Sequence, residues 1–124
     1  MIDELYDLIG GKRIVWAATE AFYRRVLADD TLRPFFKATD MEQLRARQSM
    51  FISMLLGGRI VYTGKAISAA HAQARLQGLS DGHFSAFLKH FREALNEVGV
   101  RGDKMEKVMK LLEGKRSTVL GSCE

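Results

Sequence analysis

The sequence predicts an all-α domain. Apolar residues recur every three or four positions in several stretches, as on the buried face of a helix, and no stretch alternates like a half-buried strand. The one proline, Pro34, leaves the longer periodic stretches uninterrupted. A chain of 124 residues can bury one substantial core, so we expect a single domain over residues 1–124, with a polar tail from 114 to 124.

The first part of the chain predicts two helices, over residues 3–9 and about 13–28, separated by Gly10-Gly11. One face of the second helix carries Val15, Thr19, Phe22, Tyr23, Val26 and Leu27. The hydroxyl of Tyr23 needs a partner if it is buried, although a lone tyrosine more commonly reaches water at the edge of a core. Phe35-Phe36, directly after Pro34, are expected to fold back over the core.

The stretch 39–58 predicts a third helix, with Thr39 or Asp40 as N-cap, Glu42 or Gln43 at capping-box spacing, and Gly57-Gly58 at its end. Its buried stripe would hold Leu44, Gln48, Phe51, Ile52 and Leu55. A buried amide without a partner costs about 1–3 kcal/mol, so something must satisfy Gln48. The stripe therefore indicates either the wall of an occupied pocket or a core with one polar partner.

A short helix around residues 67–74 carries His71 among small residues, which leave room for a bulky, flat group. A lone histidine on such a face is more often simply packed.

Ser80 or Asp81 caps the next helix, whose buried stripe holds Phe84, Phe87, Leu88, Phe91, Leu95 and Val98. His83 and His90 lie about 10 Å apart along it, too far to share a metal ion, and are read as structural.

The last helix would start at a capping signal formed by Asp103 and Glu106 and carry Met105, Val108, Met109 and Leu112 on one face.

The net charge of +4 is spread along the chain. We therefore interpret the basic side chains as solvated and expect no nucleic-acid partner. These side chains are Arg45, Arg47, Lys115 and Arg116. No apolar run could span a bilayer, no secretory signal is evident, and the one cysteine, Cys123, can form no internal disulfide. A cytoplasmic, reducing setting is expected.

The residues that remain for chemistry are Tyr23, Gln48 and His71. The sequence contains no phosphate-binding glycine loop, nucleophile elbow or metal-spaced pair of histidines or cysteines. Two hydrogen-bond donors and an imidazole facing one apolar space are what a haem pocket requires, because imidazole ligates the iron and the donors stabilise a polar diatomic ligand opposite. Spacing alone does not establish that these three groups converge.

A resemblance over residues 5–112 bears on this question. The motifs occur in the order and spacing typical of the truncated haemoglobins, most closely group I: Leu5-Gly11, Phe22-Tyr23, Pro34-Phe36, Thr39-Met41, Leu44-Gln48, Phe51, Leu56-Gly58, Tyr62-Gly64, Ala69-His71 and His83-Phe84. The resemblance implies a two-over-two helical sandwich around haem b. It also implies that His71 is the proximal iron ligand and that Tyr23 and Gln48 are distal donors.

The same resemblance implies further contacts with the cofactor. Leu44 would lie at the distal site, Phe36 would pack on the haem face, and Arg47 and Thr39 would reach a propionate. Phe51, Leu56, Tyr62 and Phe84 would line the pocket. Arg47 stands where some relatives carry a histidine that binds the iron, and the chain has no carboxy-terminal histidine for covalent attachment. Pentacoordinate iron and non-covalent haem are therefore expected, and Ile52 would change any tunnel gate.

The implied function is reversible binding of O₂, and of CO and NO, with high O₂ affinity from the Tyr23 and Gln48 hydrogen bonds, in a monomer. Two alternatives remain open from the sequence. One is a nitric oxide dioxygenase that uses the same site and an external reductase. The other is a haem-free helical interaction module in which Gln48 and His71 are ordinary core residues.

Overall fold

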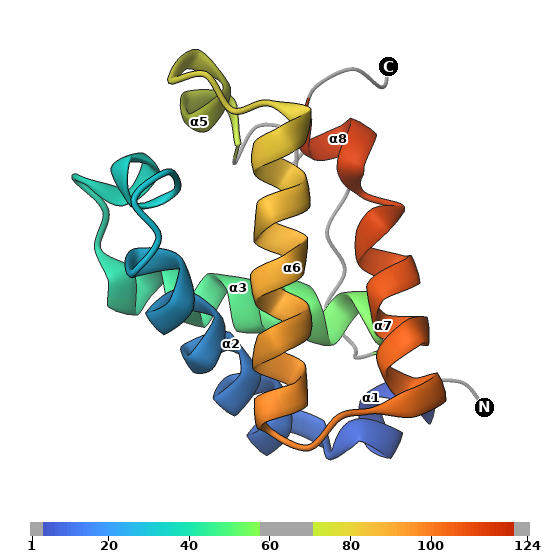
Figure 1. The fold of residues 1–124 in the computed structure, drawn as a ribbon. Helices are drawn as coiled ribbons and strands as arrows, with labels where there is room; N and C mark the ends of the chain where they lie inside the picture. The colour runs from blue at the N-terminus through green and yellow to red at the C-terminus, as the bar shows by residue number, and fades with distance from the viewer. Residues whose placement is uncertain (1–3, 58–70, 121–124) are drawn as a thin grey trace.

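The computed structural model describes residues 4–57 and 71–120, and every regular element in these two ranges is helical (Figure 1). The prediction of an all-α fold is confirmed. In chain order the elements are α1 (Glu4–Ile9), α2 (Gly11–Leu27), the 3₁₀ helix η1 (Arg33–Phe36), α3 (Met41–Leu55), α5 (Ala72–Leu76), α6 (Asp81–Glu97), α7 (Gly102–Glu113) and α8 (Arg116–Leu120).

Two pairs of helices form the body of the molecule. α2 packs against α3, α6 packs against α7, and the pairs meet where α2 crosses α6 (Figure 1). α1 closes one end of the body against α2 and α7, while α5 and α8 lie at the other end, where α6 begins. This is the two-over-two arrangement that the sequence implied.

The buried face of α2 explains why this helix is central to the fold. Val15, Ala18, Thr19, Ala21, Phe22, Tyr23 and Val26 are all buried. Thr19 is fully buried, and its hydroxyl is satisfied because it donates to the Val15 carbonyl at 2.7 Å. The helix starts at Gly11, two residues before its predicted start, because Gly10 takes a left-handed φ of 119° and a side chain there would collide with Ile14.

α3 differs from its predicted stripe. Asp40 is the N-cap, accepting from the amides of Glu42 and Gln43 at 3.1 and 3.2 Å. Only Ser49 and Ile52 are fully buried in this helix, whereas Leu44, Gln48, Phe51 and Leu55 are half-buried. α3 therefore turns Ser49 and Ile52 toward the core and leaves the rest of its apolar face partly uncovered.

A glycine and a capping box separate α5 from α6. Gly78, with φ 97°, follows α5, and the amides of Gly78 and Leu79 donate to the carbonyls of Arg75 and Ala74 at 3.0 Å each. Ser80 then caps α6 together with His83, whose ring accepts from the Ser80 amide at 3.1 Å. His83 has the structural role that the sequence predicted.

The predicted start of the last long helix was wrong. α7 begins at Gly102 after Arg101, without a side-chain cap, so Asp103 lies inside the first turn, where a carboxylate favours the helix N-terminus. Glu106 is engaged elsewhere, because it accepts from the guanidinium of Arg92 on α6 at 2.9 and 3.1 Å.

The segment from 114 that was expected to be a polar tail contains a short helix, α8 (Arg116–Leu120), and Val119 on this helix is buried against Phe84. Arg116 is not a solvated side chain. Its guanidinium binds Asp81 at 2.7 Å, Ser85 at 3.1 Å and Glu113 at 2.5 Å, and lies 4.9 Å from the centre of the Phe84 ring. Arg45 is likewise engaged, lying 4.4 Å from the centre of the Trp16 ring.

Candidate functional site

Tyr23 lies in the middle of an aromatic cluster formed by α2, η1 and α6. Its ring packs edge-on against Phe22 at 4.8 Å and against Phe36 at 5.9 Å between ring centres. Phe87 from α6 completes the group, 6.1 Å from both Phe22 and Phe36. Such edge-to-face pairs contribute about 0.5–1.5 kcal/mol each beyond area burial, so the cluster fixes the direction of the phenol.

The hydroxyl of Tyr23 is a neutral hydrogen-bond donor without an acceptor among the described residues. Burial raises the pKa of the phenol well above its usual range, and the positive charge of the Arg47 guanidinium on α3 partly opposes that rise. The residue is only 7% exposed, yet its hydroxyl makes no hydrogen bond within the part of the chain that the structure describes. The hydroxyl is therefore a donor that is available to a bound group with an acceptor.

Gln48, Leu44 and Phe51 lie together on the partly uncovered face of α3. All three are half-buried, and Leu44 and Phe51 pack against the core cluster that contains Tyr23. The Gln48 amide makes no hydrogen bond to the described residues. The helix α3 packs directly on α2, the helix that carries Tyr23.

Phe36 and Thr39 lie in the connection between α2 and α3. Phe36 is half-buried and held by Tyr23 and Phe87, so the prediction that this segment folds back onto the core is confirmed. Thr39 is half-buried, and its amide donates to the Phe36 carbonyl at 3.1 Å. Arg47 is exposed, as suits a side chain at the rim of a pocket.

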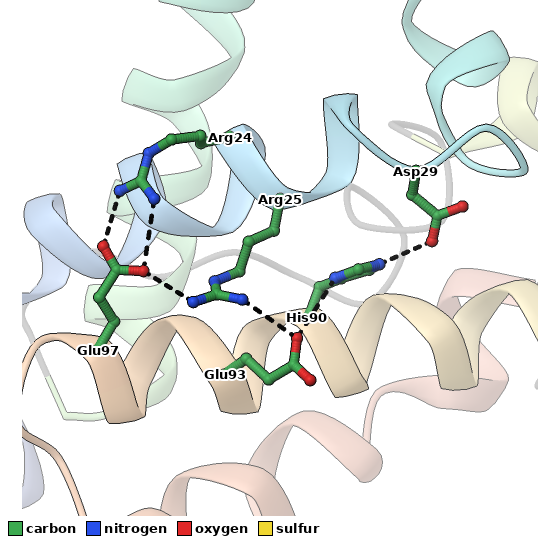
Figure 2. Close-up of polar contacts among 6 residues, drawn as sticks. All are labelled: Arg24, Arg25, Asp29, His90, Glu93 and Glu97. Carbon is green, nitrogen blue, oxygen red and sulfur yellow. Dashed lines mark hydrogen bonds and ion pairs between the residues drawn. The ribbon is translucent and has the colours of Figure 1, made fainter.

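A polar ladder, made of Arg24, Arg25, Asp29, His90, Glu93 and Glu97, holds α2 and the turn after it against α6 (Figure 2). The guanidiniums of Arg24 and Arg25 bind Glu97 at 2.8 and 3.0 Å, and Arg25 also reaches Glu93 at 3.4 Å. His90 Nε2 donates to Asp29 at 2.7 Å. Because Arg24 and Arg25 follow Tyr23 directly, the ladder fixes the helix segment that carries the phenol.

Asp29 organises the turn that leads to Phe36. Its carboxylate accepts from His90 and from the amide and hydroxyl of Thr31, at 2.9 and 2.7 Å, while its own carbonyl accepts from the amides of Leu32 and Arg33. The hydrogen bond from His90, followed by those from Thr31, holds the pKa of the Asp29 carboxyl well below its usual range.

This shift predicts how stability depends on pH. A carboxyl with a lowered pKa in the folded state stabilises the fold above its unfolded pKa of about 3.9, and that contribution is lost as the pH falls through and below this value. We expect Asp29→Asn to lower the free energy of unfolding in urea at pH 6, and the difference from the unmodified chain to shrink by pH 3. Asp30→Asn is the matched control, because the Asp30 side chain is 86% exposed. An equal loss at both pH values would contradict the assignment.

His71 lies directly before α5 and is half-buried, and its carbonyl accepts from the Arg75 amide at 3.0 Å. Of the predicted helix around residues 67–74, the structure describes only the part from His71 onward. The three candidate residues therefore lie on different elements: His71 lies in the segment before α6, Tyr23 lies on α2 and Gln48 lies on α3.

The remaining predicted pocket residues fall in different places. Phe84 is buried in a second cluster with Val119, beneath Arg116, and Phe51 packs against both this cluster and the main core. Leu56 is 3% exposed, and its carbonyl accepts from the Tyr6 amide at 3.0 Å, which ties α1 to the end of α3. Tyr62 lies outside the described residues.

Sequence reasoning missed two side chains that hold the site in place. The first is Asp29, which no motif in the sequence singled out, and the second is Phe87, which was predicted only as one member of a long apolar stripe. Their packing and hydrogen-bond partners include residues distant in the sequence, so no local pattern could reveal them.

An open groove of about 540 Å³ lies between α6 and α7. It is lined by Leu88, Met109 and charged side chains, and it contains none of the predicted site residues.

Two further properties bear on the site. Within residues 4–57 and 71–120, no three side chains of His, Cys, Asp or Glu are grouped so that they could hold a metal ion by themselves. No helix in those two ranges is long and apolar enough to cross a membrane.

Comparisons with known proteins agree with this arrangement. The family described as bacterial-like globin matches residues 4–120. The chain is 38% identical over 117 residues to the group 1 truncated hemoglobin of Tetrahymena pyriformis, covering 94% of each chain. It is 36% identical over 105 residues to group 1 truncated hemoglobin GlbN of Synechocystis, covering 84% of this chain and 85% of that one.

Solved structures give the same answer. The truncated hemoglobin of Tetrahymena pyriformis in its Fe(III) form superposes with a TM-score of 0.84 at 35% identity, covering 94% of this chain and 97% of that one. The 2/2 hemoglobin from Synechococcus in the cyanomet state, with covalently attached heme, superposes with a TM-score of 0.87 at 33% identity, covering 94% and 98%. The chain therefore belongs to the bacterial-like globins and, within them, to the group 1 truncated haemoglobins.

Proposed function

We propose that this chain holds haem b non-covalently through His71 and binds O₂ reversibly, with Tyr23 and Gln48 as distal hydrogen-bond donors. Membership of the globin family implies the haem. The observation that supports the finer proposal is a buried phenol on α2 and a half-buried amide on α3, the helix packed against it, neither of which donates to another described residue.

The residues on the α2 and α3 side fit a flat apolar cofactor with one polar edge. Phe36, Leu44 and Phe51 are half-buried apolar side chains, so a macrocycle could cover their remaining exposed surface. Arg47 is an exposed cation close enough to oppose the pKa shift of Tyr23, and we assign it to a propionate, with Thr39 beside it. When bound, haem supplies a ferrous iron with one open position for a diatomic gas.

The role of the protein is to ligate the iron and to stabilise the gas. The His71 imidazole is the proposed iron ligand. Tyr23 stays protonated because burial raises the pKa of its phenol, so its O–H remains available as a donor at neutral pH. Hydrogen bonds of this kind are worth about 1–3 kcal/mol in a dry site, which slows gas release by roughly tenfold for every 1.4 kcal/mol. We therefore propose slow dissociation and high affinity for O₂.

Titration with haem tests the cofactor assignment. We expect the apoprotein to take up one equivalent of haem, with a sharp Soret band that saturates at a 1:1 ratio. Denaturation in acidified organic solvent should then extract all of the haem from the protein, because the proposed attachment is non-covalent. A chain that stays colourless after the titration would exclude the proposal, and haem that resists extraction would exclude its non-covalent part.

A further inference from the structure

α5 cannot define its own position. It has five residues, well below the length at which an isolated helix is stable in water. Its end is closed locally by Gly78, and one residue of this turn, Leu79, packs against the cluster that contains Phe84 and Val119. Because His71 immediately precedes α5 and its carbonyl accepts from the Arg75 amide, whatever positions α5 also positions the backbone that carries the imidazole.

Arg75 provides a link from α5 to a distant element. Its guanidinium Nη1 donates to the carbonyl of Val119 at 2.9 Å, across 44 residues of sequence, in a partly buried position. Arg75 follows His71 by one helical turn, and its amide donates to the His71 carbonyl. Val119 lies in the last turn of α8, where carbonyls lack partners within the helix, and the guanidinium supplies a donor to one of them.

α8 is itself anchored firmly enough to serve as a support. Arg116 ties it to the start of α6 through Asp81 and Ser85, and the guanidinium covers the ring of Phe84. Val119 is 7% exposed and packs into the Phe84 cluster, which also receives Leu79 from the turn after α5. α5 and α8 both lie beside the beginning of α6 (Figure 1).

We propose that Arg75 is a positioning residue for the proximal histidine: by binding the Val119 carbonyl it holds α5 against α8 and so sets the direction from which His71 reaches the iron. This inference rests on the proposed role of His71. Arginine suits the task because its guanidinium stays charged at every accessible pH, and a charge-assisted hydrogen bond is about twice as strong as a neutral one.

The test replaces Arg75 by methionine, which keeps the length of the side chain and removes its donors. We expect haem to transfer to an excess of an acceptor apoglobin about tenfold faster than from the unmodified protein. We also expect the iron–histidine stretching band of the reduced, ligand-free protein to shift or broaden in resonance Raman spectra. Arg92→Met is the matched control, since it removes an arginine that bridges α6 and α7 through Glu106.

The iron–histidine Raman band distinguishes a role of Arg75 in positioning His71 from a role in stabilising the fold. If Arg75 merely stabilised the fold, Arg75→Met would lower the melting temperature and leave the band as it is in Arg92→Met, which would overturn the inference. Unchanged transfer and an unchanged band would overturn it as well. Should Arg75→Met fail to fold, Arg75→Lys is expected to give intermediate values for both readouts, and values equal to the unmodified protein would count against the inference. An unmodified chain without an iron–histidine band would instead refute the role of His71.

Discussion

Replacing His71 by glycine is expected to abolish the protein-supplied iron ligand and to lower haem affinity by about a hundredfold or more. Loss of a residue that only supports a metal ligand typically costs ten- to hundredfold in affinity, and loss of the ligand itself should cost at least as much. The measurement is haem titration followed by absorption spectroscopy of the reduced form. We expect no iron–histidine band in the resonance Raman spectrum of any haem that remains bound.

Two controls make this result specific. Free imidazole can enter the space left by the side chain, so adding it to His71→Gly should restore much of the spectrum of the unmodified protein. His83→Gln removes a different imidazole, the one in the α6 capping box, and should cost only about 1 kcal/mol of stability with no change in the spectrum. Normal haem uptake and an unaltered spectrum in His71→Gly would contradict the assignment of the ligand.

Replacing Tyr23 by phenylalanine is expected to raise the O₂ dissociation rate constant roughly five- to hundredfold, the range that corresponds to the loss of 1–3 kcal/mol. The ring contacts with Phe22 and Phe36 would remain, so the fold should be retained. Stopped-flow mixing of the oxygenated protein with excess CO measures this rate. CO dissociation should change much less, because bound CO carries little charge for a donor to stabilise.

Tyr6→Phe is the matched control, since Tyr6 is half-buried on α1 and lies outside the aromatic cluster of Tyr23. Its O₂ dissociation rate constant should equal that of the unmodified chain. Gln48→Leu should accelerate release in the same direction as Tyr23→Phe if both groups donate. An O₂ dissociation rate constant that is unchanged in Tyr23→Phe would exclude the phenol as a distal donor.

The long helices could be predicted from the sequence because their signals are local. The apolar stripe of α6, the Ser80 cap and the Asp40 cap each depend on residues within a few turns of one another. α8 could not be predicted in this way, because five mostly polar residues become a helix only when Arg116 reaches Asp81 and Val119 meets Phe84. The start of α7 was mispredicted for a related reason, since Glu106 pairs with Arg92 instead of capping its own helix.

The candidate site also contains features that could be predicted from local sequence and features that could not. Tyr23, Gln48 and His71 were identifiable as polar side chains on apolar faces, and the order of the motifs indicated the family. The long-range contacts that hold the helices carrying these residues could not be identified from the sequence. Asp29 and His90 are 61 residues apart, and Arg75 and Val119 are 44 residues apart, so the helix packing itself creates these contacts. The sequence thus predicts candidates for the chemistry, and the fold reveals which contacts hold the helices that carry them.

The absorption spectrum of the reduced protein, recorded with and without CO, tests the central claim most directly. If His71 ligates haem and the opposite side is open to gas, the reduced form should show the single broad visible band of pentacoordinate ferrous haem. CO should then convert it to a sharp, shifted Soret band with two visible bands. A reduced spectrum that already has the two sharp visible bands of a hexacoordinate haem, or one that CO leaves unchanged, would contradict the account.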